Sequence, residues 1–204
     1  GASLIVVGDT TMAELLPVLE KHFGDWKVGA GSGAPAIPAV ANVKQPRVFL
    51  IDQPGAVQAN IFAAQLVPSS KDAGAIAFDM ANMVFGGDFT ARLNMNLRED
   101  KHWSYGARSG AASAVGQRMW RATAPVQIDK AGESVAEIRR EIAEFFGGSR
   151  GTSAEELARQ QKGLTLSLPG AYETAGSVLA TIGSNVLYGR PDDYVFRRKA
   201  EIEA

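Results

Sequence analysis

One stretch, residues 86–108, constrains the fold of this 204-residue chain more than any other. We call it the corner, because it passes from a helical to a strand-like pattern. Its two opening glycines allow the backbone to turn with positive φ. The four-residue spacing of Leu93 and Leu97 then predicts a short helix with one apolar face, capped by Asp88 or Thr90.

The second part of the corner has the period of a strand. From Trp103 onward, Trp103, Tyr105 and Ala107 alternate with Ser104, Gly106 and Arg108. Asn94 and Arg98 lie four residues apart on a predicted polar face of the preceding helix. Because the helix ends near Arg98 and the strand begins soon after, we expect a guanidinium and a phenol to lie side by side.

The corner resembles a run found in the C-terminal homologous half of the M16 zinc peptidases, G-G-x-x-x-S/T-R-L-x-x-x-L-R-E…Y-G. This family includes the pitrilysin, insulin-degrading and mitochondrial-processing group. Residues 51–58 resemble the strand-turn-strand that opens that half, and residues 4–9 with Phe23-Gly24-Asp25-Trp26 resemble the end of the preceding half. The resemblance covers nearly the whole chain.

Hydrophobic periodicity and turn residues predict the remaining elements. Strands are expected at residues 4–7, 47–52, 58–67, 103–110 and 118–128, the last four as two hairpins. Helices are expected at 11–22 and 70–85, with three more marked by Val135 to Phe146, Ser153 to Leu168 and Val178 to Val186, and a fourth opened by Pro191. Hairpins followed by helices favour an α+β fold, an antiparallel sheet with helices layered on one face. The resemblance implies the same architecture, one half of the LuxS/MPP-like metallohydrolase fold.

Residues 29–41 are rich in glycine, alanine, proline and serine, which predicts an extended linker. We therefore expect three parts: a strand-helix remnant of the preceding half at 1–28, a linker at 29–45, and a C-terminal-type M16 domain at 46–204 that lacks its terminal strand. Leu4 to Val7 is expected to replace that strand in the sheet. Alternatively, it packs against a second copy in a swapped homodimer.

Composition excludes several classes of partner. The formal charge of −1 gives no footprint for nucleic acid, and no apolar run is long enough to span a bilayer. The absence of cysteine excludes thiolate zinc sites and cysteine nucleophiles, and it suits the cytosol and the periplasm equally.

A catalytic zinc ion is not expected on this chain. The only histidines, His22 and His102, are eighty positions apart, and the predicted helix at 70–85 has none. His22 suits a helix C-terminus and His102 a solvated loop. The carboxylate pairs Glu155-Glu156 and Asp192-Asp193 stand at helix starts, where the helix dipole explains them. In the resembled family, the zinc ligands form an H-x-x-E-H motif with a distal glutamate in the N-terminal half.

The resemblance implies a substrate-binding role for Arg98 and Tyr105. In the family, the arginine and tyrosine at these motif positions reach across to the catalytic half, where both hydrogen-bond the peptide and the tyrosine stabilises the developing oxyanion. The residues alone leave a structural alternative open, in which Arg98 pairs with Glu99 or Asp100 and Tyr105 is a half-buried strand aromatic. Trp103 either shapes a peptide subsite or anchors the core.

We therefore predict the substrate-binding, non-metal half of an M16-type zinc metalloendopeptidase, inert by itself. Its expected partners are a catalytic half, in the same polypeptide or in another subunit, and a peptide substrate. The alternative is a pseudo-peptidase subunit that serves as a chaperone or scaffold. A third class, an independent domain that binds a small molecule, would need a closed pocket with convergent polar groups, and no sequence motif indicates one.

Overall fold

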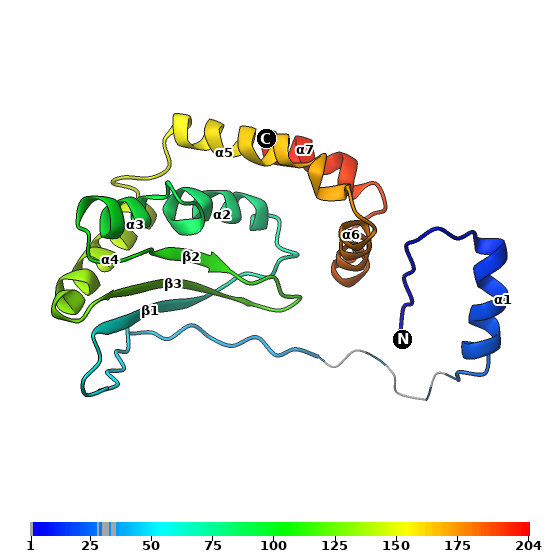
Figure 1. The fold of residues 1–204 in the computed structure, drawn as a ribbon, viewed down its shortest axis with the longest axis horizontal. Helices are drawn as coiled ribbons and strands as arrows, with labels where there is room; N and C mark the ends of the chain where they lie inside the picture. The colour runs from blue at the N-terminus through cyan, green and yellow to red at the C-terminus, as the bar shows by residue number, and fades with distance from the viewer. Residues whose placement is uncertain (1, 28, 30–32, 34–35) are drawn as a thin grey trace.

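A computed structural model describes residues 2–27, 29, 33 and 36–204 of the chain. At its centre lies strand β3 (Arg118–Gln127), hydrogen-bonded on one side to β1 (Gln58–Val67) and on the other to β2 (Arg108–Ala111) (Figure 1). Both pairings are antiparallel. The sheet confirms that the corner leads into a hairpin with residues 118–128.

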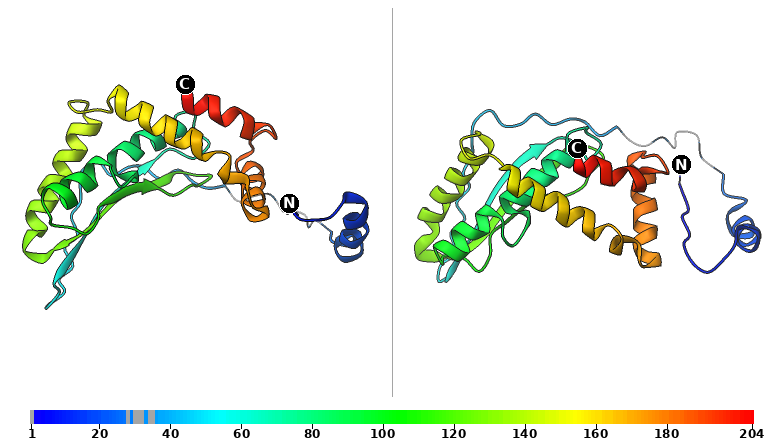
Figure 2. Two further views of the ribbon diagram at one scale, coloured as in Figure 1. Left: turned by 45° about the horizontal axis from the view of Figure 1, so that its top comes forward. Right: turned by 90° about the horizontal axis from the view of Figure 1, so that it is seen from above.

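One face of the sheet is buried. Along β3, Trp120, Ala122, Ala124 and Val126 are buried, while Met119 and Arg121, on the opposite face, are exposed. Figure 2 shows the helices that follow β1 in the chain gathered on a single side of the strands, with the N-terminal helix apart from them. This alternation and layering confirm the predicted α+β fold, because a half-buried antiparallel strand alternates apolar and polar residues.

The helices supply the other half of the core. Phe85, which is fully buried, packs its ring 5.9 Å from the ring of Trp120 and 5.3 Å from those of Phe145 and Phe146. The helical elements are α1 (Met12–Phe23), α2 (Ala75–Asn82), η1 (Met83–Gly87), α3 (Arg92–Asn94), η2 (Met95–Asp100), η3 (Ile128–Lys130), α4 (Ala131–Phe146), α5 (Ala154–Ser167), η4 (Gly170–Tyr172), α6 (Ala175–Tyr188) and α7 (Tyr194–Glu203).

The predicted helix caps of α1 and α5 are confirmed. Thr11 with Glu14, and Ser153 with Glu156, form reciprocal capping boxes. The cap predicted for the corner helix at Asp88 or Thr90 is wrong, because Ala91 takes the cap position of α3 and no side chain bonds there. Two other starts are shifted. The helix predicted from Ser70 begins only at Ala75, because Ser70 exchanges hydrogen bonds with Ala114 instead. Helix α7 begins at Tyr194, three residues after Pro191.

The strand predicted at Leu4 to Val7 is wrong. The structure gives this run no strand and no sheet partner, and Leu4 and Val6 are exposed. A strand needs a neighbour for its backbone hydrogen bonds. Nearby α1 has no buried residue and lies to one side of the sheet (Figure 1). The swapped homodimer concerns a second chain and stays a prediction. The proposed boundaries at 28 and 45 also stay predictions, with part of the linker outside the described residues.

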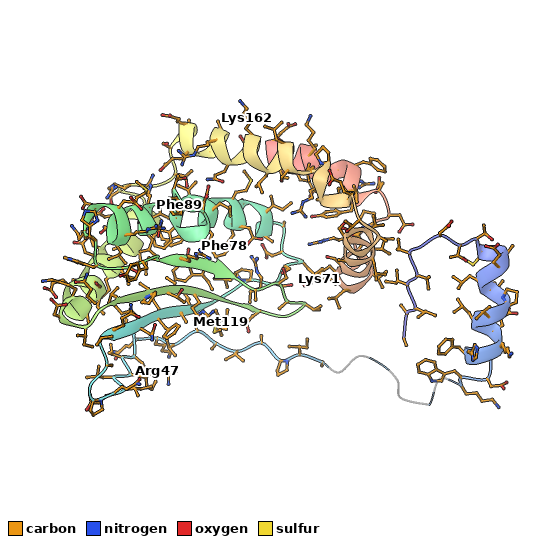
Figure 3. The ribbon with its side chains drawn as sticks, viewed as in Figure 1. Arg47, Lys71, Phe78, Phe89, Met119 and Lys162 are labelled. Atoms are coloured by element: carbon orange, nitrogen blue, oxygen red, sulfur yellow. The ribbon has the colours of Figure 1, made fainter. Side chains whose placement is uncertain are left out.

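The hairpin between residues 47–52 and β1 is also wrong. Its turn is formed, with Ala56 N–H donating to the Gln53 carbonyl at 3.2 Å and Gly55 at φ +79°, but residues 47–52 form no strand. The side chain of Leu50 is 94% exposed. Figure 3 shows Arg47 on this segment, away from the helices. A continuous apolar run favours a strand covered on both faces, and the helices cover only one.

Helix η1 comes very close to β2 at Gly86. A Cβ atom on Gly86 would lie 2.4 Å from Ser109 Oγ and 2.8 Å from Ser109 N. Gly86 and Gly87 are not among the glycines with positive φ, so the expected turn conformation is wrong. The Gly86 position instead needs a glycine because no side chain fits between η1 and the strand.

Replacing Gly86 with alanine tests this close approach. The added methyl would push η1 away from Ser109, so we expect the free energy of unfolding to fall by about 1–3 kcal/mol. Gly110→Ala is the matched control, since no atom lies within 4 Å of the Cβ position of Gly110. Urea denaturation measures both variants, and equal losses would contradict this explanation.

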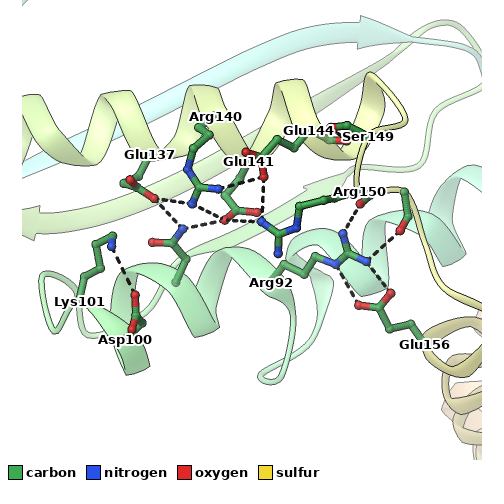
Figure 4. A network of polar contacts seen from close by, with 12 residues as sticks. Arg92, Asp100, Lys101, Glu137, Arg140, Glu141, Glu144, Ser149, Arg150 and Glu156 are labelled. Carbon is green, nitrogen blue, oxygen red and sulfur yellow. Dashed lines mark hydrogen bonds and ion pairs between the residues drawn. The ribbon is translucent and has the colours of Figure 1, made fainter.

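Arg92 and Glu156 join the start of the corner to α5. The guanidinium of Arg92 donates to both carboxylate oxygens of Glu156, at 2.9 and 2.6 Å, and also to the carbonyls of Arg150 and Gly151 (Figure 4). The Arg92 guanidinium lies 5.1 Å from the centre of the Phe145 ring. These donors lower the pKa of Glu156 from 4.5 to about 2.

This pair makes stability depend on pH. A carboxyl whose pKa is lowered by folding stabilises the protein above its ordinary pKa, and this contribution is lost as the pH falls toward the lowered value. We therefore expect Glu156→Gln to lower the free energy of unfolding by about 1–2 kcal/mol at neutral pH. The difference from the parent protein should shrink between pH 4.5 and about 2.

The control for this experiment is Glu155→Gln, a change at the neighbouring exposed carboxylate, for which the structure records no ion pair within its described residues. Glu155→Gln loses only the favourable interaction of this carboxylate with the helix dipole, so denaturation by urea across this pH range should show a smaller difference for that variant than for Glu156→Gln. A pH-independent loss in Glu156→Gln would show that the pair does not titrate as described.

Candidate functional site

The corner closes with backbone hydrogen bonds to the end of its helix. The N–H groups of Trp103 and Ser104 both donate to the carbonyl of Leu97, at 2.9 and 3.2 Å. His102, at φ 58°, reverses the chain just before Trp103. The Nδ1 atom of His102 lies 3.1 Å from the carbonyl oxygen of Arg98. The predicted strand therefore begins at Arg108 instead of Trp103, with Ser104 forming an isolated bridge to Val126.

A buried amide holds the two arms of the corner together. Asn94 Nδ2 donates to the carbonyl of Phe89 at 2.7 Å, and Asn94 Oδ1 accepts from the N–H of Ala107 at 3.1 Å. Asn94 is 3% exposed, so its predicted place on a polar face is wrong. The sequence gives one sign that Asn94 could join the two arms of the corner. It stands next to the apolar Leu93, between the paired glycines and the strand-like residues. Buried and fully paired, the amide fixes where Tyr105 is presented.

Arg98 lies at the surface of η2. Its side chain is 39% exposed, and its Nε lies 3.2 Å from a carboxylate oxygen of Glu99. The guanidinium carbon also lies 4.7 Å from the centre of the Phe89 ring. The pairing with Glu99 is the one that the structural alternative predicts. A pair so exposed is worth about 0–1 kcal/mol, so the guanidinium exchanges partners at little cost.

Tyr105 is displayed to solvent. The residue is 85% exposed, so it is not the half-buried strand aromatic of the structural alternative. Among the described residues, the structure records no hydrogen bond from its hydroxyl, and the partners recorded for the Arg98 side chain are Glu99 and Phe89 instead of Tyr105. The side chains of Arg98 and Tyr105 thus come from the same corner without a hydrogen bond between them. Both keep hydrogen-bond donors for another molecule, N–H groups on Arg98 and the O–H of Tyr105.

Trp103 belongs to the core. It is partly buried and packs against the core cluster, while the ammonium groups of Lys101 and Lys130 lie 5.5 and 6.0 Å from its ring centre. This placement supports the core-anchor interpretation of Trp103. The neighbouring Ser104 hydroxyl donates to the carbonyl of Pro125 at 2.6 Å, which fixes the same turn against β3.

Charged side chains of α4 bind to η2, the helical part of the corner (Figure 4). Asn96 Nδ2 donates to Glu137 at 2.8 Å and to Glu141 at 2.7 Å. Arg140 bridges the same two carboxylates, at 2.6 and 2.9 Å. Hydrogen bonding from Arg140 lowers the pKa of Glu137 below its ordinary value. The Glu137 carboxylate therefore stays ionised beside Arg140, and its lowered pKa makes it a weak base.

The described residues contain no group of three histidine, aspartate or glutamate side chains placed to hold a metal ion. His22 lies in the last turn of α1, as predicted, and His102 lies at the corner. Asp193 pairs with Arg197 at 2.6 Å, and Glu156 pairs with Arg92, so these carboxylates have structural partners. Among the residues that the structure describes, none of the helices has the length and apolar character of a membrane span.

Comparison with known proteins gives a consistent result. A family model described as the peptidase M16 inactive domain matches residues 1–164. A protease from Helicobacter pylori superposes with a TM-score of 0.74 at 16% identity, over 97% of this chain and 47% of that one. The periplasmic protease PqqL from Escherichia coli gives 0.73 at 16% identity, over 96% and 21%. A search of curated proteins finds no match.

An M16 inactive domain from Pseudomonas fluorescens is similar at 20% identity, with a TM-score of 0.66 over 81% of this chain and 42% of that one. The chain thus spans less than half the length of these three solved structures. At such identities, superposition establishes the fold, while the match to the family model covers most of the chain. The chain belongs to the M16 peptidase family, whose inactive domain it matches.

Proposed function

We propose that this chain is the substrate-binding, non-metal half of an M16-type zinc metalloendopeptidase. The observation that carries the proposal is the corner itself, which buried hydrogen bonds of Asn94 hold in place while it displays Tyr105 to solvent. A rigid support beneath an exposed donor is what a site for peptide recognition requires. Family membership supports the same role, and the expected partners are a catalytic half and a peptide.

Each of the two side chains has a separate task in this proposal. Arg98 offers several fixed N–H donors, and releasing Glu99 lets them bind peptide carbonyl oxygens. Tyr105 offers one O–H donor, directed at the oxygen on which negative charge develops. Zinc, held by the other half, would supply the activated water for peptide hydrolysis. The described residues of this chain provide no ligand set for it.

Tyr105→Phe tests the oxyanion role in the complete protein that carries the zinc-binding half. Only one hydroxyl is removed, from a residue that is 85% exposed, so folding should not change. Loss of one oxyanion donor lowers kcat by about a hundredfold or more. Peptide cleavage with unchanged kcat and normal circular dichroism would contradict the role of Tyr105.

Arg98→Ala tests substrate binding by the guanidinium. We expect KM for a peptide substrate to rise by about tenfold or more, because hydrogen bonds from a charged donor are lost. Arg139→Ala is the matched control, an exposed arginine on α4 for which the structure records no ion pair within its described residues. A KM that is unchanged, or that rises equally in both variants, would remove the proposed role.

The same assay separates the main alternative. A zinc peptidase loses peptide cleavage when a chelator is added and recovers it with zinc. A complete protein that cleaves no peptide under either condition would instead support a pseudo-peptidase subunit that acts as a chaperone or scaffold.

A further inference from the structure

A second candidate site lies between the C-terminal helices, away from the corner. Helices α5 and α7 run side by side, with Gln161 Nε2 donating to the carbonyl of Ile202 at 2.9 Å, and α6 crosses near one end (Figure 2). The three helices and η4 enclose a pocket of about 330 Å³. This volume falls within the range of about 300–1,000 Å³ that is common for sites of small organic ligands.

The pocket is positively charged. Arg190 and Arg198 both line it, and none of its lining residues is acidic. The guanidinium carbon of Arg190 lies 4.8 Å from the centre of the Tyr188 ring and 4.5 Å from that of Tyr194. One of its nitrogens donates to Ser184 Oγ at 3.1 Å. These contacts help to hold Arg190 in place, and its other N–H donors can bind a planar anion.

Neither arginine has a carboxylate partner in the part of the chain that the structure describes. The nearby ion pairs of α7 join Arg197 to Asp193 and Lys199 to Glu203, and they leave Arg198 out. Both guanidinium groups are partly exposed and have no carboxylate partner within the described residues, so an anion in the pocket would be attracted to both. The charge pattern therefore points to a ligand with a negative group.

A buried amide in the same pocket lacks a partner. Asn185 lines the pocket and is buried, and its Oδ1 has no hydrogen-bond partner among the described residues. Because water cannot reach this oxygen, a ligand N–H would recover its cost of about 1–3 kcal/mol only after the Asn185 side chain turns toward the pocket. Leu164, Leu168 and Ile202 add an apolar part to the same wall.

We propose that this pocket binds the C-terminus of a peptide. A C-terminal carboxylate is planar and matches the guanidinium groups of Arg190 and Arg198. The N–H of the last residue would supply the donor that Asn185 Oδ1 lacks, and an apolar last side chain would contact the leucines. The choice of a peptide as ligand rests on the proposed function, whereas the anion site rests on the pocket alone.

The test uses the tripeptide acetyl-Ala-Ala-Leu with a free C-terminal carboxylate, the same peptide as its C-terminal amide, and acetyl-leucine. Isothermal titration calorimetry measures binding to the 204-residue protein, without a zinc-bearing half. We expect the free acid to bind at least about tenfold more tightly than the amide, because hydrogen bonds between charged groups are lost in the amide. Acetyl-leucine has the same carboxylate, N–H and last side chain, so it should bind nearly as tightly as the tripeptide.

Arg198→Gln should weaken binding of the free acid by at least about tenfold. Lys199→Gln, which removes one positive charge from the next position of α7 but does not line the pocket, should bind like the parent protein. Arg190→Gln gives a second test, provided that its circular dichroism matches the parent protein, since Arg190 also packs between tyrosines.

Equal binding of acid and amide, or no effect of Arg198→Gln, would overturn the site. Acetyl-leucine binding much more weakly than the tripeptide would overturn the assignment of these contacts to the last residue. None of these outcomes depends on cleavage, so they are independent of the kinetic tests of Arg98 and Tyr105. A failure of either set of experiments is therefore assigned to its own site.

Discussion

Burial of a single face of β3 is the constraint on which the rest of the structure depends. Trp120, Ala122, Ala124 and Val126 form a flat apolar surface, and the fully buried Phe85 presses η1 against it. The side chains of Ala122 and Ala124 are small. Because a core is packed without large voids, the helices lie close to the strand at these positions. The outer face stays open, with Met119 and Phe62 exposed.

Two buried amides turn this apolar packing into a defined geometry. Asn82 Oδ1 accepts from Ser109 Oγ at 2.6 Å and from Trp120 Nε1 at 2.8 Å, so it fixes α2 on the strands. Asn94 does the same for the corner. Apolar contacts alone tolerate sliding, whereas a buried amide is satisfied in one arrangement. The corner can therefore present Tyr105 at the surface without being loose.

The two proposed binding regions differ in how they were found. The corner was visible in the sequence, because its residues are contiguous and resemble the M16 run. The pocket joins residues of α5, α6 and α7, spread over almost forty positions, and no spacing rule connects them. Only packing of the three helices shows that Arg190, Arg198 and the unpartnered Asn185 share one space. In both regions, guanidinium groups would meet the polar groups of a peptide.

The sequence by itself determined the features whose energetics are local. Capping boxes at Thr11 and Ser153, the helix of Leu93 and Leu97, and the alternation along β3 follow from hydrogen bonds and periodicity within a few residues. Tertiary structure alone decided which apolar runs become strands: residues 4–7 and 47–52 have the pattern but no bonded neighbour. Tertiary structure also decided that Asn94 is buried and that position 86 has no room for a side chain. The physical reason is that a strand, a buried amide and a close backbone contact each need a partner from elsewhere in the chain, and a local pattern does not contain that partner.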